Sequence, residues 1–227
     1  MNKIYYVIIV LLLIAALAMM AKLRQDYTQL LSTTLYKKKD PKEYMALLES
    51  KKAKILIPRK QRLFMKLNLY QICSDVEGVK SLFKQIDDLR LTPNEKLNYL
   101  ATKIYYAILE GHGKQAARLL DQIKLLAPVS NDPNAMNILH EADVSYRLNI
   151  QHDLELKEVL LKDIEEAKTD NEKMLANIRL AKLLYLNNFS ENDVNEYLIK
   201  AKSFAVTESE SQLIDLVLQD HEQLRNA

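Results

Sequence analysis

The 227-residue chain contains few of the residues that make turns, namely three Gly and five Pro, and it has one Cys and no Trp. The shortage of Gly and Pro argues against an all-β protein and against collagen-like or low-complexity chains. The single cysteine, Cys73, excludes an intramolecular disulfide and a cysteine-cluster metal site. Hydrophobic residues make up 48% and charged residues 27% of the chain, which excludes a disordered tail. The length is enough to bury a core in one or two domains.

The first feature that is present is an uncharged apolar run over Ile4–Ala21. As a helix its 18 residues span about 27 Å, close to the hydrocarbon thickness of a bilayer. Tyr5 and Tyr6 lie at one end, where aromatic rings prefer the membrane interface. The alternative is a cleavable signal peptide with a cleavage site at Ala16-Leu17-Ala18. Because the apolar run continues past that site, we expect a retained transmembrane anchor.

The helix is expected to continue beyond the anchor. Leu23, Tyr27, Leu30, Leu31 and Leu35 recur at helical spacing and mark one face. One helix from Ile4 to about Tyr36 is therefore predicted, with its last turns packed on the rest of the protein.

Charge is distributed unevenly along the chain. Residues 22–66 contain 13 Lys and Arg against 4 Asp and Glu, whereas residues 67–227 contain 18 against 26. Three interpretations of these basic residues are open. They are solvated helix faces, residues retained on the cytoplasmic side of a membrane, or groups that attract anionic lipid headgroups. A nucleic-acid partner is not expected, because no known nucleic-acid motif accompanies them. Only Lys3 precedes the apolar run and Lys37–Lys39 follow it, so the positive-inside rule favours a cytoplasmic domain. The extracytoplasmic alternative stays open, since large domains translocate despite their charge.

The remaining chain reads as a series of helices with capping signals at their starts. The signals are Asp40-Pro41, Ser74 with Glu77, Thr92 with Glu95, Asp132-Pro133, Thr169 with Glu172, Ser190 with Asp193, and Thr207 with Glu210. The predicted helices cover residues 41–53, 58–73, 75–90, 93–110, 114–127, 133–150, 153–168, 170–187, 191–205 and 208–225. In the last one we expect Leu213, Ile214, Leu216, Val217 and Leu224 to dock on the preceding helices. No segment alternates as a strand would, so an all-α fold is predicted.

Alternate helices start at 58, 93, 133, 170 and 208, a period of 35 to 40 residues that is typical of an α-solenoid. Within residues 99–128 a Gly ends the first helix (Gly111), an Ala opens the second (Ala116), and Leu120 and Pro128 follow, with Tyr105-Tyr106 earlier in the unit. This pattern resembles a degenerate tetratricopeptide repeat, over about residues 58–205. The chain departs from the family in lacking a Trp and in having Gly78 at the Ala position of the preceding unit. The resemblance implies a right-handed solenoid of antiparallel hairpins with a concave groove for proteins or peptides.

Residues that could carry chemistry do not fall into known catalytic or metal-binding patterns. None of His112, His140, His152 and His221 pairs with another at a spacing of four, and no phosphate-binding glycine loop exists. We expect His112 to be a solvated loop residue and Cys73 a small core residue. No catalytic, cofactor-binding or metal-binding residue is therefore predicted.

These observations divide the chain into an anchor (residues 1–21), basic juxtamembrane helices (22–57) and a repeat domain with a C-terminal capping helix (58–227). The expected function is a membrane-tethered, non-catalytic scaffold for an unknown, membrane-associated protein or peptide, with the bilayer contacted through residues 4–21. The alternative is a module whose basic region binds anionic headgroups while the solenoid is structural.

Overall fold

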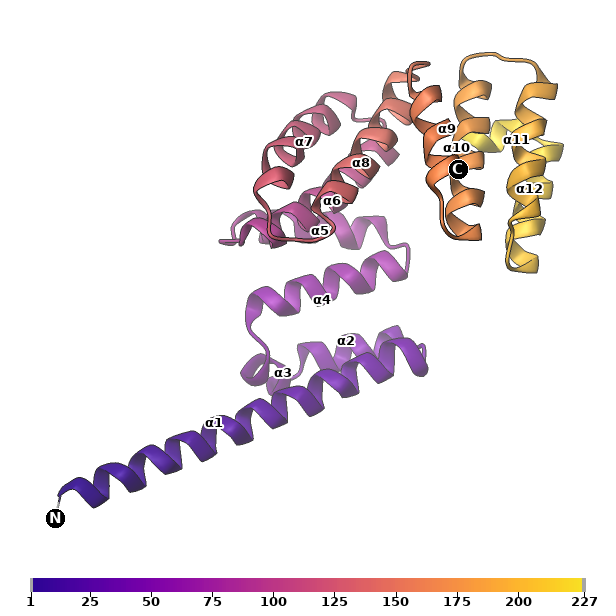
Figure 1. Ribbon diagram of the computed structural model, residues 1–227. Helices are drawn as coiled ribbons and strands as arrows, with labels where there is room; N and C mark the ends of the chain where they lie inside the picture. Colours follow the sequence, from indigo (N-terminus) through magenta and orange to yellow (C-terminus); the bar gives the residue numbers. More distant parts are fainter. Residues whose placement is uncertain (1, 226–227) are drawn as a thin grey trace. The chain divides into compact units, whose positions relative to one another are not determined.

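The computed structural model describes the backbone of residues 2–225 and the side chains of residues 9–225. Over these residues the chain is all-α, as predicted, with helices joined by short loops and no strand (Figure 1). The chain consists of two compact units, residues 1–90 and residues 91–227. This division falls inside the predicted repeat domain 58–227.

Unit 1 (residues 1–90) begins with one long helix that ends in a π-helical turn, Thr33–Lys37. Its helices are α1 (Asn2–Ser32), α2 (Pro41–Glu49), α3 (Lys51–Leu56), α4 (Arg59–Ile72) and α5 (Val76–Asp87). The predicted helix over 41–53 is divided in two, because the Ser50 side chain accepts a hydrogen bond from the Ala53 backbone N–H and starts a new helix. The other predicted bounds in this unit hold within three residues.

The end of α1 is part of the core of unit 1. Tyr27, Leu31 and Leu35 are buried and pack with Leu48 of α2 and Ile57 after α3. This confirms that the first helix runs on into the folded part of the chain. Leu23 and Leu30 were expected on the same buried face, but they are exposed, because the contact with α2 and α3 covers a narrower stripe of α1.

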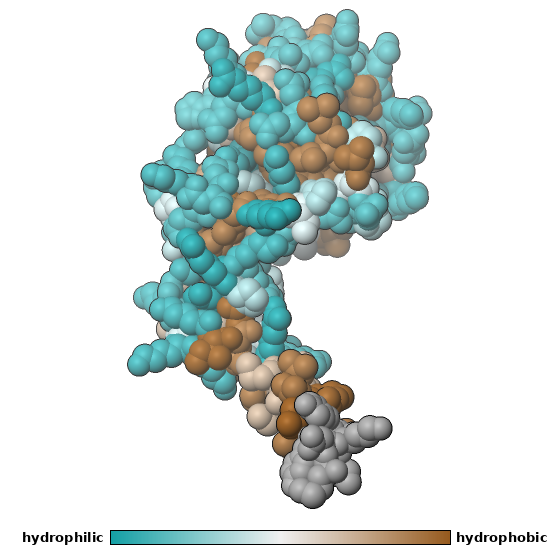
Figure 2. Space-filling model, turned by 90° about the vertical axis from the view of Figure 1, so that its left-hand side faces the viewer, coloured by the Kyte–Doolittle hydropathy of each residue, from teal (hydrophilic) through white to brown (hydrophobic). Residues whose placement is uncertain are grey.

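The N-terminal part of α1 projects away from the core of unit 1 (Figure 1). The large apolar side chains between Ile9 and Met20 are exposed, and Figure 2 shows apolar side chains, in brown, gathered along this part of the chain. The expected anchor, Ile4–Ala21, includes residues 4–8, whose side chains lie outside the described residues. Within the part of the chain that the structure describes, no helix has the length and apolar character needed to cross a membrane.

Unit 2 (residues 91–227) is a succession of seven α-helices over its described residues, followed by a 3₁₀ turn at His221–Arg225. They are α6 (Pro93–Leu109), α7 (Gly113–Leu126), α8 (Ala135–Tyr146), α9 (Leu156–Glu166), α10 (Asp170–Leu186), α11 (Glu191–Ser203) and α12 (Glu208–Gln219). Two hydrophobic cores meet at α8, which contributes Ala135 and Ala142 to the core of α6 and α7. The same helix contributes Val144 to the second core, which is built by α9 to α12.

Most predicted helix starts have the expected capping chemistry. Thr92, Thr169 and Thr207 each form a capping box with a Glu three residues later. Two predictions were wrong. The cap of α5 is Asp75, not Ser74, and it accepts a hydrogen bond from Gly78 N–H. Pro133 lies before α8, which starts two residues later at Ala135.

A left-handed turn residue recurs along both units. Lys39, Ser74, Gly111, His152 and Asn188 have positive φ angles, and successive members of this set lie 35, 37, 41 and 36 residues apart. At Gly111 the turn is closed by hydrogen bonds from Gly111 N–H to Ile108 O and from His112 N–H to Ala107 O. The predicted helix-ending role of Gly111 is thus confirmed.

Two expectations about side-chain burial were wrong. Cys73 is exposed, because α4 ends one residue before it and it no longer shares the buried face of Leu69. On α12 Ile214 is buried, and Leu224 is buried in the turn that follows, but Leu213 and Leu216 are exposed. The docked face of α12 carries Ile214, Val217 and Leu218, and residues one position before that face point away from it.

Candidate functional site

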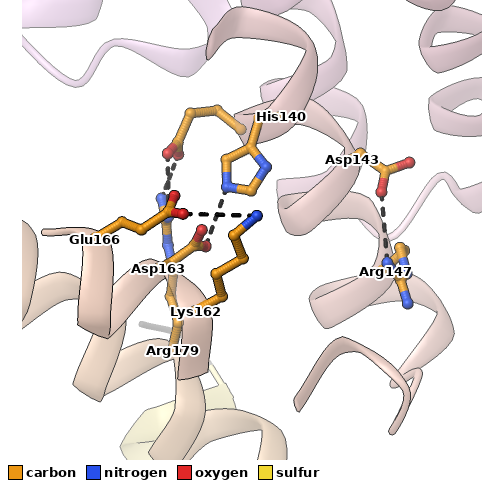
Figure 3. Close-up of polar contacts among 8 residues, drawn as sticks. His140, Asp143, Arg147, Lys162, Asp163, Glu166 and Arg179 are labelled. Carbon is orange, nitrogen blue, oxygen red and sulfur yellow. Dashed lines mark hydrogen bonds and ion pairs between the residues drawn. The ribbon is translucent and has the colours of Figure 1, made fainter. Parts of the chain in front are cut away.

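A network of charged side chains on α8 reaches the two helices that follow it (Figure 3). His140 Nε2 lies 3.0 Å from Asp163 Oδ2 on α9. Arg179 of α10 donates to both carboxylate oxygens of Glu141, at 3.2 and 2.5 Å. A bidentate pair of this kind fixes direction as well as distance. The network therefore holds α8 in one orientation against α9 and α10.

The same helix makes further ion pairs near its C-terminal end. Asp143 lies 3.2 Å from Lys124 of α7 and 3.8 Å from Arg147. Arg147 Nε donates to Asp153 Oδ2 at 2.7 Å, and this bond holds the pKa of the Asp153 carboxyl below its usual range. These contacts close the turn between α8 and α9 and connect it back to α7.

The His140–Asp163 pair has the arrangement of the base and its orienting carboxylate in a catalytic triad. A carboxylate that orients an imidazole is found beside nucleophiles in hydrolases. Over the described residues, Asp163 is the only hydrogen-bond partner of the His140 side chain. The pair joins α8 to α9.

Two polar residues are buried on α10. Asn177 is 1% exposed and donates to Lys173 O, while its Oδ1 has no hydrogen-bond partner among the described residues. Lys182 is 5% exposed, and burial lowers the pKa of its ammonium group. Both lie on the helix most deeply packed in unit 2, between α9 and α11.

Exposed apolar side chains recur on the first helices of successive helix pairs. Leu175 on α10 and Leu213 on α12 both lie six residues after a capping threonine, and they are 41% and 60% exposed. Tyr105 and Leu109 on α6 and Met136 on α8 are exposed as well. Of these, Leu175 and Leu213 lie at equivalent places of two repeats, and large apolar side chains left in water there are candidates for partner contact.

The basic residues of unit 1 lie on its surface. Lys38 pairs with Glu43, and Lys66 pairs with Glu49. Others are exposed and, in the described part of the chain, form no ion pair: Lys22, Lys37, Lys39, Lys42, Lys51, Lys54 and Arg59. The predicted basic region is therefore mostly uncompensated.

Two hollows on the described surface are open to solvent. One lies along a face of α1, at residues 21–32, and the other at the start of α7, at His112–Gln115. Each is lined by a single segment, so neither has the enclosure that a small ligand needs. Among the described residues no group of His, Cys, Asp and Glu could hold a metal ion. His112 is exposed in its turn, as expected.

No protein-family model, curated protein or solved structure matches this chain.

Several side-chain hydrogen bonds of unit 2 recur at the repeat period, a regularity that no single sequence motif contains. Hydrogen bonds join residues about one repeat apart: Asn94 with Ser130, His152 with Asn187, Glu141 with Arg179, and Tyr185 with Glu222. The separations are 36, 35, 38 and 37 residues, respectively, close to the spacing of the left-handed turns. Complementary polar residues at the repeat period could have indicated them from sequence.

Proposed function

We propose that the protein is a membrane-tethered, non-catalytic scaffold that binds another protein through its helical repeats. The proposal includes the finer fold reading, a right-handed solenoid similar to tetratricopeptide repeats. It is supported by the left-handed turns at a period of 35 to 41 residues and by the hydrogen bonds one repeat apart. Stacked repeats of this length produce extended surfaces suited to protein partners.

The observation that carries the proposal is the exposure of Leu175 and Leu213. Both follow a capping threonine by six residues, so they occupy equivalent places on α10 and α12. The fold does not need either side chain for its core, since Leu180 and Ile214 supply the buried contacts of these helices. A partner with an apolar surface would bury them, at about 25 cal/mol per Å² of area removed from water.

The tether is the second part of the proposal. Its basis is the uncharged sequence run Ile4–Ala21, together with the exposure of the side chains between Ile9 and Met20. Exposed apolar side chains of this number are unfavourable in water and favourable in hydrocarbon. Basic residues follow the run, so the domain is proposed to face the cytoplasm. A tether raises the effective concentration of a membrane-bound partner.

A cross-linking experiment tests the scaffold. A photoreactive phenylalanine analogue replaces Leu175 in the full-length chain, and cross-linked products are isolated from membranes and identified by mass spectrometry. One discrete protein partner is expected. Leu213→Ser should lower the yield roughly tenfold, as for a central apolar contact. Leu125→Ser is the control, because Leu125 is 76% exposed on a second helix, α7.

The result that overturns the scaffold is an equal loss of yield in Leu213→Ser and Leu125→Ser, or no discrete product from Leu175. Turnover of a substrate that is lost in His140→Ala, with the fold intact, would instead make the protein an enzyme. Digestion of the domain by protease added outside intact cells would reverse the proposed orientation without affecting the scaffold.

A further inference from the structure

We propose that one face of unit 1, formed by Lys51, Lys54, Ile55 and Arg59, contacts anionic lipid headgroups at the membrane surface. This face is called the α3 face below. The inference rests on the proposed tether and adds a second, electrostatic contact with the same membrane. It concerns the place of unit 1 on the lipid surface and not the protein partner of unit 2.

The position of α3 along α1 is the first step. Tyr27 OH of α1 donates to Leu47 O at 2.9 Å and lies 2.8 Å from Ser50 Oγ, just before α3. Lys52 Nζ on α3 lies 5.2 Å from the centre of the Tyr27 ring. One turn earlier, Arg24 donates to Gln61 Oε1 at 2.6 Å. The start of α3 and the start of α4 are thus packed against residues 24–27 of α1.

The apolar stretch of α1 ends immediately before this contact. Met20 is the last exposed large apolar residue within Ile4–Ala21, and Arg24 follows four residues later, a rise of about 6 Å. Figure 1 shows α3 beside α1 where the free N-terminal part of α1 begins. A membrane that holds the apolar stretch therefore has its surface near α3 and the start of α4.

The chemistry of the α3 face is that of a headgroup contact. Lys51, Lys54 and Ile55 have the i, i+3, i+4 spacing that places residues on one side of a helix. Lys51, Lys54 and Arg59 have no ion pair within the described residues. Ile55 lies between Lys54 and Arg59 in the sequence and is 74% exposed, which leaves an apolar side chain in water for no internal purpose. Basic side chains around an inserted apolar residue suit an anionic lipid surface.

The nearby acid, Glu49, offsets only part of this charge. Glu49 is hydrogen-bonded to Lys66, and this bond is the main reason that the pKa of its carboxyl lies below its usual range. The charge of Lys54 lowers the same pKa more weakly, and Lys51 and Arg59 are not among the causes of the shift.

Lys37–Lys39 form the more conspicuous basic run, but they lie far from the proposed membrane surface. Residue 37, at the end of the π-helical turn that continues α1, is 16 residues beyond residue 21, a rise of about 24 Å. The screening length at physiological salt is about 8 Å. Headgroups at the level of α3 therefore interact weakly with Lys37–Lys39, which makes these residues a control with the same number of charges.

The absence of Trp from the chain provides the probe. The full-length Ile55→Trp protein is reconstituted in phosphatidylcholine vesicles and in vesicles that also contain phosphatidylglycerol. In the anionic vesicles we expect the fluorescence to shift to the blue and to be quenched by brominated lipid. Ile72→Trp, at the other end of α4 and 51% exposed, is the control and should show neither change.

Charge variants in the Ile55→Trp protein test the basic residues. Lys51→Gln, Lys54→Gln and Arg59→Gln together should remove the shift and the quenching seen with phosphatidylglycerol. Lys37→Gln, Lys38→Gln and Lys39→Gln together should preserve both. Equal losses in the two triple variants would overturn the proposal, since charge alone and not the α3 face would then explain the effect.

Three other outcomes separate the proposals. If the Ile55→Trp protein floats with vesicles but gives the same emission in both lipids, the α3 face is wrong and the tether stands. If the protein does not float with vesicles, both the tether and the proposed lipid contact of the α3 face are wrong. A concentration-dependent blue shift in detergent without lipid would assign the face to a second protein copy instead.

Discussion

Arg179 on α10 donates two hydrogen bonds to Glu141 on α8, across 38 residues of sequence. The geometry of the pair allows both guanidinium nitrogens to bond at once, and the Arg179 side chain is 24% exposed. The pair connects a helix shared by both cores of unit 2 to the central helix of the second core.

The first prediction concerns this pair. Arg179→Ala should lower the free energy of unfolding by about 1 kcal/mol, because a partly exposed bidentate pair is worth more than a fully exposed one. Urea unfolding of the full-length protein in mild detergent, followed by circular dichroism, measures the change. Lys162→Ala removes an exposed pair with Glu166 and should have little effect. Equal effects of the two variants would show that Arg179 contributes no more than a surface charge.

The second prediction is a pH dependence at the start of α10. Backbone hydrogen bonds from Lys168 and Thr169 lower the pKa of the Glu172 carboxyl. Its stabilising effect is therefore complete above the unfolded-state pKa, about 4.3, and is lost as pH falls through the lower folded-state pKa.

Thermal unfolding between neutral and acidic pH tests this sign. Glu172→Gln should flatten the fall in melting temperature with acidification, since the amide oxygen accepts the same bonds without titrating. Glu165→Gln, on the exposed surface of α9, should leave the pH profile unchanged. A steeper acid transition in Glu172→Gln than in the wild type would contradict the argument.

The third prediction concerns the buried Asn177. Its Oδ1 has no partner among the described residues, and an unsatisfied buried oxygen costs about 1 to 3 kcal/mol. Asn177→Leu, of similar size, should therefore raise the urea midpoint, whereas Asn177→Asp should lower it by burying a charge. Asn187→Leu is the contrasting case, because Asn187 donates to His152 O and its loss should destabilise the protein. Destabilisation by Asn177→Leu would indicate that its amide is fully satisfied.

The fourth prediction uses the left-handed turns. Ser74 has a φ of 53°, a conformation that costs a residue with a Cβ atom roughly 1 kcal/mol relative to Gly. Ser74→Gly should raise the free energy of unfolding by up to that amount. Gly111→Ala should lower it similarly, because a Cβ atom there meets nothing within 4 Å and only the backbone at φ +70° is strained. Opposite signs in these two variants, measured by urea unfolding, are the expected result, and the same sign in both would be contrary to it.

The helix starts were the part of the fold that the sequence could predict, because capping depends on residues close together in the chain. Thr92, Thr169 and Thr207 mark helix starts because the cap and its partner lie within four residues of each other. Burial was less predictable, since Leu213 differs from its buried neighbour by one position on a helix, and that position is set by the packing partner.

Contacts between helices were beyond the reach of local patterns. Glu141 and Arg179 lie 38 residues apart, so only the repeat period, and not the residues around either one, could indicate their pairing. The repeated left-handed turns were hidden because Lys, Ser, His and Asn occupy four of the five positions instead of Gly.

Helix α1 continues without a break from its apolar stretch to Leu31 in the core of unit 1. The apolar stretch and the core therefore have a fixed rotation relative to each other about the helix axis. A helix turns by about 100° for each residue, so the direction in which unit 1 faces is set by the number of residues between Met20 and Arg24. One inserted alanine at that point would turn the unit by about 100° around α1, whereas seven would nearly restore its direction and move it about 10 Å along the axis. In α1 the apolar stretch and the core of unit 1 are thus joined by continuous helix and not by a linker, so the length of this spacer sets azimuth as well as distance.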